Sequence, residues 1–101
     1  MQIQESYNHC IGIVGLGNAG YAIASAFAKF TVVHGFDLKV EKRNNAFLNG
    51  IVSHDDLDTF SSVVDVAILS LPHPDISLQV TRQLINLDVK PKLIIDTSTV
   101  T

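Results

Sequence analysis

Three glycines with the spacing of a phosphate-binding turn stand between two segments of different character. Gly15, Gly17 and Gly20 come after an apolar run over 10–14, and small residues at helical spacing come after them. A turn of this kind between a strand and a helix lets the backbone approach a diphosphate closely and directs helix N–H groups at it. Glycine-rich turns are common, but in this context residues 15–20 predict a dinucleotide site.

An acidic residue closes the next β-type run along the chain. Asp37 follows residues 31–36, which are rich in β-branched and aromatic side chains. A carboxylate at that place accepts hydrogen bonds from the ribose of adenosine. It favours the free 2′-hydroxyl of NAD and repels the 2′-phosphate of NADP, although Lys39 nearby would partly offset that repulsion. We therefore expect NAD as the cofactor, with NADP as the alternative.

β-Type and helical segments alternate along the chain. The strands that we expect cover 10–15, 31–36, 51–53, 66–71 and 93–96, and the helices cover 18–29, 41–48, 55–63 and a stretch to about 87 with Asp75 as its N-cap. The strand runs are apolar or β-branched, and the helical stretches repeat apolar residues at helical spacing. This order predicts an α/β fold of the Rossmann type, a doubly wound parallel sheet with helices on both faces.

The ends of the last two predicted strands carry further candidate residues. In an open parallel sheet, ligands bind beyond the carboxyl ends of the strands. Leu71 and Pro72 stand at the end of the fourth strand, and Asp96 closes the fifth. The hydroxyls of Ser98 and Thr99 follow, and they suit either the cap of a following helix or hydrogen bonds to a cofactor or a small polar substrate. The residues leave both interpretations open.

The chain offers no catalytic constellation of its own. His9, His34, His54 and His73 lack the spacing of metal ligands, and we interpret them as exposed residues. No nucleophile with an adjacent base and no Walker-type lysine is visible. We therefore predict neither catalytic nor metal-binding residues.

Composition limits the classes of protein that remain. A chain of 101 residues that is 47% hydrophobic predicts one domain over 1–101. A net charge of −3 and scattered basic residues argue against nucleic acid or an anionic membrane as partner, and no apolar run is long enough for a membrane span. The single cysteine, Cys10, is expected at the start of a buried strand and fits a reducing compartment, so a cytoplasmic protein is expected.

Three motifs together resemble the β-hydroxyacid dehydrogenase family. They are IGIVGLGNAG at 11–20, DVAILSLP at 65–72 and LIIDTSTV at 93–100. The family includes 3-hydroxyisobutyrate dehydrogenase and is related to 6-phosphogluconate dehydrogenase. The resemblance implies an N-terminal Rossmann domain that binds NAD or NADP, followed in full-length members by a helical domain. It implies that 1–101 is a fragment, because the family's substrate loop and catalytic lysine would lie after Thr101.

The resemblance also implies roles for single residues. Cofactor contacts are implied for Gly15, Leu16, Gly17, Asn18, Ala19, Gly20, Asp37, Leu71, Pro72 and Thr99. The residues of the turn would hold the diphosphate, Asp37 would hold the ribose, and Leu71 with Pro72 would line the nicotinamide side. Ser98 is the candidate for substrate contact. Ala19 departs from the family, which usually carries methionine there.

The expected function is therefore that of the NAD(P)-binding domain of an oxidoreductase, which interconverts a small hydroxyacid and its aldehyde or keto form by hydride transfer. Two alternatives remain. The text AFAKFTVVHGFDL at 26–38 is similar to nucleotide-sugar (UDP-hexose) dehydrogenases. A non-catalytic module that senses a nucleotide would carry the same turn. An uncovered cleft or sheet edge is also compatible with a homo-oligomer.

Overall fold

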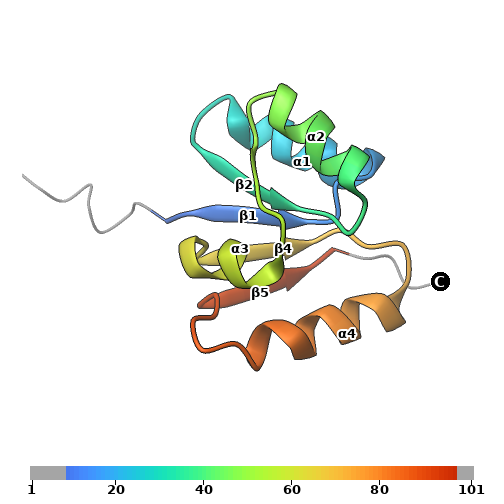
Figure 1. Cartoon of the computed structure of the whole chain (residues 1–101), viewed down its shortest axis with the longest axis vertical. Coiled ribbons are helices and arrows are strands. Elements are labelled where there is room, and N and C mark those ends of the chain that lie inside the picture. Colours follow the sequence, from blue (N-terminus) through green and yellow to red (C-terminus); the bar gives the residue numbers. More distant parts are fainter. Residues whose placement is uncertain (1–8, 98–101) are drawn as a thin grey trace, which may run out of the picture.

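The computed structural model describes residues 9–97, in which five strands form one sheet and helices connect them (Figure 1). The elements are β1 (Ile11–Val14), α1 (Asn18–Ala28), β2 (Val33–Phe36), α2 (Val40–Leu48), β3 (Val52–Ser53), α3 (Leu57–Val63), β4 (Val66–Leu69), α4 (Pro74–Ile85) and β5 (Leu93–Asp96). All four ladders are parallel, in the order β3-β2-β1-β4-β5. The predicted Rossmann-type sheet is confirmed.

The first strand lies in the middle of the sheet. Ile13 of β1 is paired with Gly35 of β2 on one side and with Ile68 of β4 on the other. The chain builds outward from β1 to β2 and β3, then crosses back to build β4 and β5. The carboxyl ends of β1 and β4 therefore form the point at which the winding reverses, where ligands of such sheets bind.

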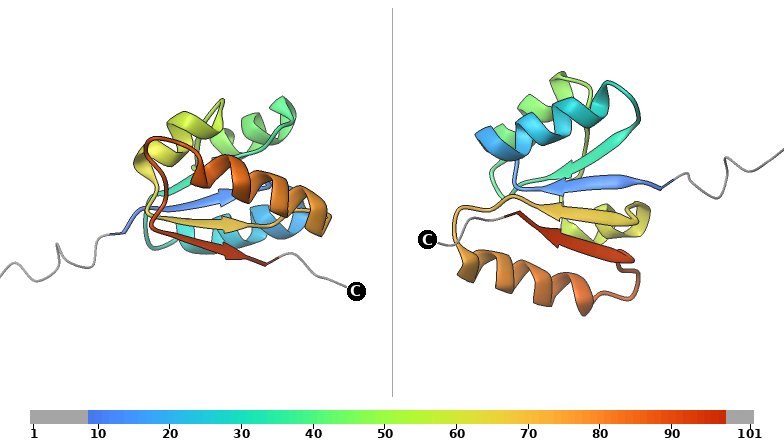
Figure 2. Two further views of the ribbon diagram at one scale, coloured as in Figure 1. Left: turned by 90° about the horizontal axis from the view of Figure 1, so that it is seen from below. Right: turned by 180° about the vertical axis from the view of Figure 1, so that it is seen from behind.

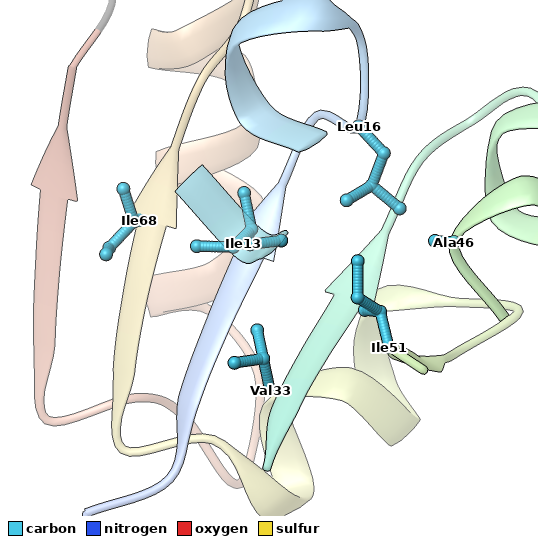
Figure 3. Close-up of a cluster of buried hydrophobic side chains, with 7 residues drawn as sticks. Ile13, Leu16, Val33, Ala46, Ile51 and Ile68 are labelled. Carbon is cyan, nitrogen blue, oxygen red and sulfur yellow. The ribbon is translucent and has the colours of Figure 1, made fainter. Parts of the chain in front are cut away.

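Helices cover both faces of the sheet, and α1 and α4 lie on opposite sides of it (Figure 2). Each face has its own hydrophobic cluster. The cluster on the α1 side, drawn in Figure 3, consists of Ile13, Leu16, Ala24, Val33, Ala46, Ile51 and Ile68. The two alanines come from α1 and α2, and their small side chains let both helices approach the strands closely.

The second cluster lies against α3 and α4. Its buried members are Val14, Phe36, Phe60, Val64, Ala67, Leu69 and Leu84. Phe60 of α3 packs over Gly12 of β1, where an added Cβ would overlap the phenyl ring and lie 2.7 Å from a methyl group of Val64. The missing side chain of Gly12 therefore lets α3 pack directly on the central strand.

Two sequence-based expectations about single residues are wrong. Cys10 is exposed, because β1 begins one residue later. Its backbone carbonyl accepts from the N–H groups of Asp65 and Val66 where β1 and β4 begin. Asp75 is not the N-cap of α4. His73 occupies that position, and Pro74 opens the helix, as its fixed φ favours.

Strand ends also differ from the prediction. β2 begins at Val33 rather than residue 31, since the N–H groups of Phe30 and Thr31 close a turn on the carbonyl of Phe27. β4 ends at Leu69 rather than residue 71.

The helices are short, and α4, the longest at 12 residues, buries Leu84 while Leu78 is half exposed. This one-sided burial is typical of a helix that packs on a sheet. Across the part of the chain that the structure describes, no helix has both the length and the apolar character needed to cross a membrane.

Candidate functional site

Two glycines of the turn are required by close packing within the protein. Gly15 has φ +98°, and a Cβ there would overlap the carbonyl oxygen of Ser70 at the end of β4. A Cβ on Gly20 would overlap the carbonyl oxygen of Gly15. These two residues therefore bring the start of α1 tightly against the ends of β1 and β4.

Gly17 is different, because no contact among residues 9–97 requires it. Apart from its two chain neighbours, none of these residues has an atom within 4 Å of the place where its Cβ would be, and its φ of −70° suits any residue. Gly17 is the N-cap of α1 and lies on the wall of a cavity. The free space in front of its Cα is therefore available to a bound molecule.

The N-terminus of α1 is arranged to receive an anion. Its N-cap makes no side-chain hydrogen bond to the helix, and its first turn contains no acidic residue. Asn18, Ala19 and Gly20 of this turn lie on the same cavity wall as Gly17. Unsatisfied N–H groups and the positive end of the helix dipole favour a phosphate at such a place.

The carboxylate of Asp37 is held next to this turn. One oxygen accepts a hydrogen bond from the backbone N–H of Leu16 at 2.7 Å, and the other accepts from the N–H of Lys39 at 2.8 Å. Asp37 also borders the cavity. A carboxylate oxygen has more than one acceptor site, so these two bonds orient the group and leave it able to accept a hydroxyl.

The cavity has a volume of about 1160 Å³ and lies beyond the carboxyl ends of β1, β2 and β4. Eight of the residues predicted for the cofactor line it, namely Gly15, Gly17, Asn18, Ala19, Gly20, Asp37, Leu71 and Pro72. Pockets for small molecules and cofactors have volumes of roughly 300–1,000 Å³, so the space is large enough for a dinucleotide. Three strand ends that are distant in sequence thus meet at one site.

The remaining predicted residues are placed differently. The side chain of Leu16 points away from the cavity into the hydrophobic cluster on the α1 side, where it is 2% exposed, and only its backbone N–H faces Asp37. Ser98 and Thr99 lie outside the described residues.

The structure adds cavity residues that sequence reasoning missed. A second wall consists of the segment 55–58, which follows β3 and is formed by Asp55, Asp56, Leu57 and Asp58. Lys42 of α2 and the inner side of α4, at Gln79 and Gln83, also line the space. The topology rule for strand ends could have found 55–58, since this segment leaves the carboxyl end of β3.

A helix cap fixes the acidic segment 55–58. Asp56 is the N-cap of α3, and its carboxylate accepts from the backbone N–H of Thr59 at 2.8 Å and from its hydroxyl at 3.0 Å. These hydrogen bonds hold the pKa of Asp56 below its ordinary value, because they stabilise the charged form.

Two histidines that we expected to be exposed contact each other instead. Nδ1 of His34 and Nε2 of His54 are 2.9 Å apart, and the His54 ring meets Phe60 edge to face. Burial is the main cause that lowers the pKa of both rings, and the charge of its neighbour lowers that of His34 further. Neither ring lines the cavity, and residues 9–97 contain no group of three or more potential metal ligands.

A parallel five-stranded sheet wound in both directions from β1, with a glycine turn and an acidic strand end on one cavity, defines a Rossmann-type dinucleotide-binding domain. Comparison with known families agrees. Residues 10–101 match the NAD-binding domain of 6-phosphogluconate dehydrogenase, and the chain belongs to this family. The match favours the hydroxyacid dehydrogenase interpretation over that of a nucleotide-sugar dehydrogenase. No protein of curated function matches the chain by sequence.

Solved structures have the same fold. The 3-hydroxyisobutyrate dehydrogenase of Mycobacterium tuberculosis, solved with L-serine, is 27% identical with a TM-score of 0.76 over 92% of this chain and 32% of its own. An imine reductase from Bacillus cereus is 20% identical with a TM-score of 0.77, over 93% of this chain and 33% of its own. A variant imine reductase from Myxococcus stipitatus, solved with NAD+, is 17% identical with a TM-score of 0.76 over the same shares. The chain thus spans about a third of the length of these proteins, and the two imine reductases support the fold alone.

Proposed function

We propose that the cavity binds NAD, and more weakly NADP, as the cofactor domain of an oxidoreductase that interconverts a small hydroxyacid and its aldehyde or keto form. The observation that carries the proposal is Gly17, which no contact among residues 9–97 requires and which borders the cavity at the N-terminus of α1. A side chain at that position would occupy the space that a diphosphate needs. The solved 3-hydroxyisobutyrate dehydrogenase supports the hydroxyacid part.

Each wall of the cavity then has a role. The N–H groups of Asn18 and Ala19 receive the diphosphate, and the carboxylate of Asp37 accepts from the ribose hydroxyls. Leu71 and Pro72 offer apolar surface to the nicotinamide end. Lys39 and Lys42 border the cavity, and their charge keeps NADP as a weaker alternative.

The bound cofactor would supply hydride transfer, while this chain would supply binding and orientation. In the proposal, Ser98 contacts the substrate and Thr99 the cofactor. The proton donor lies outside the residues assigned to the site, so the 101-residue chain alone is expected to bind without turnover.

The proposal also covers the cellular location of the protein and its self-association. The single cysteine supports a reducing, cytoplasmic location. Self-association through the free edge of β5 is supported by Leu93 and Ile95, which are half exposed on that edge strand.

Titration of the ¹⁵N-labelled chain with NADH tests the proposal directly. We expect saturable shifts of the amide signals of Gly17, Asn18 and Ala19, and calorimetry should give one site with NADH tighter than NADPH. The proposal fails if NADH causes no shifts at millimolar concentration, or if the shifts lie elsewhere, for example on the outer face of α4.

A further inference from the structure

Arg43 of α2 contacts the β2–α2 loop, which carries Asp37, the residue proposed to bind the ribose. Its Nη1 donates to the backbone carbonyl of Asp37 at 2.8 Å and to that of Leu38 at 3.2 Å. The Arg43 side chain is only 18% exposed, so these bonds are partly shielded from water. One guanidinium thus satisfies two successive carbonyls of the β2–α2 loop, a geometry that suits its planar fork of donors.

The same residue connects this loop to the acidic segment 55–58, which also lines the cavity. Nε of Arg43 lies 3.8 Å from Oδ1 of Asp55, and the backbone carbonyl of Arg43 accepts from the hydroxyl of Ser53 at 2.7 Å. Asp55 is 95% exposed, so this ion pair contributes little by itself. The bonds to the two loop carbonyls are therefore the contacts that matter most.

Arg43 does not itself line the cavity, whereas Asp37, Leu38 and Lys39 do. The carboxylate of Asp37 keeps its orientation through the N–H groups of Leu16 and Lys39, and the Lys39 N–H belongs to the same peptide group as the Leu38 carbonyl that Arg43 holds. If the carbonyls of Asp37 and Leu38 lost their donor, these two peptides would lose a restraint on their rotation. The carboxylate would then lose its fixed direction toward the cavity.

From these contacts we propose that Arg43 is a positioning residue for the adenosine half of the cofactor, acting through the backbone at Asp37 and Leu38 without touching the ligand. The inference rests on the proposed function. It assigns Arg43 an effect on one half of the dinucleotide only, because its contacts end at the β2–α2 loop and at Ser53 and Asp55.

The test compares ligands that represent the two halves. Arg43→Met keeps the aliphatic stem and removes the donors, and Arg43→Lys keeps one charged donor. Arg82→Met is the matched control, since Arg82 is an exposed arginine in the last turn of α4 that does not line the cavity. Dissociation constants for NADH, NADPH, 5′-AMP and nicotinamide mononucleotide are measured by NMR titration, and folding is checked by thermal melting.

We expect Arg43→Met to weaken the binding of NADH and of 5′-AMP by about tenfold, which corresponds to the loss of roughly one charge-assisted hydrogen bond. The binding of nicotinamide mononucleotide should be unchanged. The ratio of the NADPH to the NADH dissociation constant should fall in Arg43→Met. The dissociation constants of Arg43→Lys should lie between those of the wild type and Arg43→Met, and those of Arg82→Met should equal the wild-type values. Equal weakening of both half-ligands, or no weakening, overturns the inference while leaving the proposed function intact. If Arg43→Met does not fold, the dissociation constants of 5′-AMP and nicotinamide mononucleotide for Arg43→Lys test the inference in the same way. Failure of the wild-type chain to bind NADH overturns the proposed function, and this inference with it.

Discussion

The carboxylate of Asp37 accepts a hydrogen bond from the backbone N–H of Leu16, with 2.7 Å between the two atoms. This bond links the end of β2 to the glycine turn that follows β1. The side chain of Leu16 is meanwhile buried in the hydrophobic cluster on the α1 side, which fixes the direction of its N–H. The acidic group is therefore oriented by the protein itself, and binding would lose little entropy in ordering it.

Replacing Asp37 tests the ribose assignment. Asp37→Ala removes the acceptor for the ribose hydroxyls and the charge that repels a 2′-phosphate, so we expect NADH to bind about tenfold more weakly and NADPH to lose less. Calorimetry with both nucleotides gives the ratio. Asp37→Asn is the matched variant, since its amide oxygen keeps one acceptor, for the N–H of either Leu16 or Lys39, while the charge and the second acceptor are removed. A preference for NADH that is unchanged in Asp37→Ala would show that the assignment is wrong.

Gly17→Val should abolish cofactor binding and leave the fold intact. A Cβ at this position meets no described atom within 4 Å beyond the two chain neighbours, and Gly17 lines the cavity, so we expect a valine side chain to take up cavity space without a clash in the protein. Binding is followed by NADH titration, with Gly17→Ala expected to show an intermediate loss. Circular dichroism and a thermal melt serve as controls. Wild-type affinity in the folded valine variant would remove the main support for the diphosphate site.

Gly20→Ala should instead destabilise the protein. Its Cβ would overlap the Gly15 carbonyl oxygen, and overpacking of this kind costs about 1–3 kcal/mol or more. Gly17→Ala should cost only about 1 kcal/mol, the loss expected when alanine replaces a better N-cap residue, because its Cβ meets no clash. Urea unfolding of both variants gives the comparison. If the two variants lost similar amounts of stability, the distinction would be wrong in which Gly20 serves packing and Gly17 leaves space for a ligand.

The order of elements and the glycine turn could be predicted because their signals are local. Gly50 stops α2 with φ +87°, as expected of a glycine after a helix, and the first four residues of the run over 66–71 form the strand β4. Strand ends were less predictable, because they depend on partners. Cys10 is held just before β1 by hydrogen bonds from Asp65 and Val66, which are distant in sequence.

The second wall of the cavity was missed for the same reason. Asp55 and Asp56 appear in the sequence as residues that open a helix, and Asp56 does cap α3. Their position on the same cavity as Asp37 depends on the pairing of β3 with β2, which only the sheet order fixes. The role of Arg43 was equally hidden, since its hydrogen bonds go to backbone carbonyls that no sequence pattern marks.

The contact between His34 and His54 gives the protein a dependence on pH. Two ring nitrogens 2.9 Å apart share one proton, so one ring donates and the other accepts. Burial lowers the pKa of both rings, and the charge of His54 lowers that of His34 further. Asp56 and Asp55 act in the opposite direction on His54, but burial outweighs them. Charging both rings would remove the acceptor and place two positive charges together.

The folded protein should therefore lose stability in mild acid. Since both folded pKa values lie below the unfolded value of about 6.5, the unfolded chain binds protons first as the pH falls. The stabilisation is complete above about pH 6.5 and is lost as the pH drops through the folded pKa values. Urea unfolding between pH 7.5 and 5, from about one unit above this value to about one and a half units below it, should show the loss of stability. His54→Gln should flatten it, because the substitution removes one shifted group and the repulsion on His34. The control His73→Gln changes an exposed ring outside the pair and should keep the wild-type slope. An equally steep fall in His54→Gln would place the acid sensitivity elsewhere in the molecule.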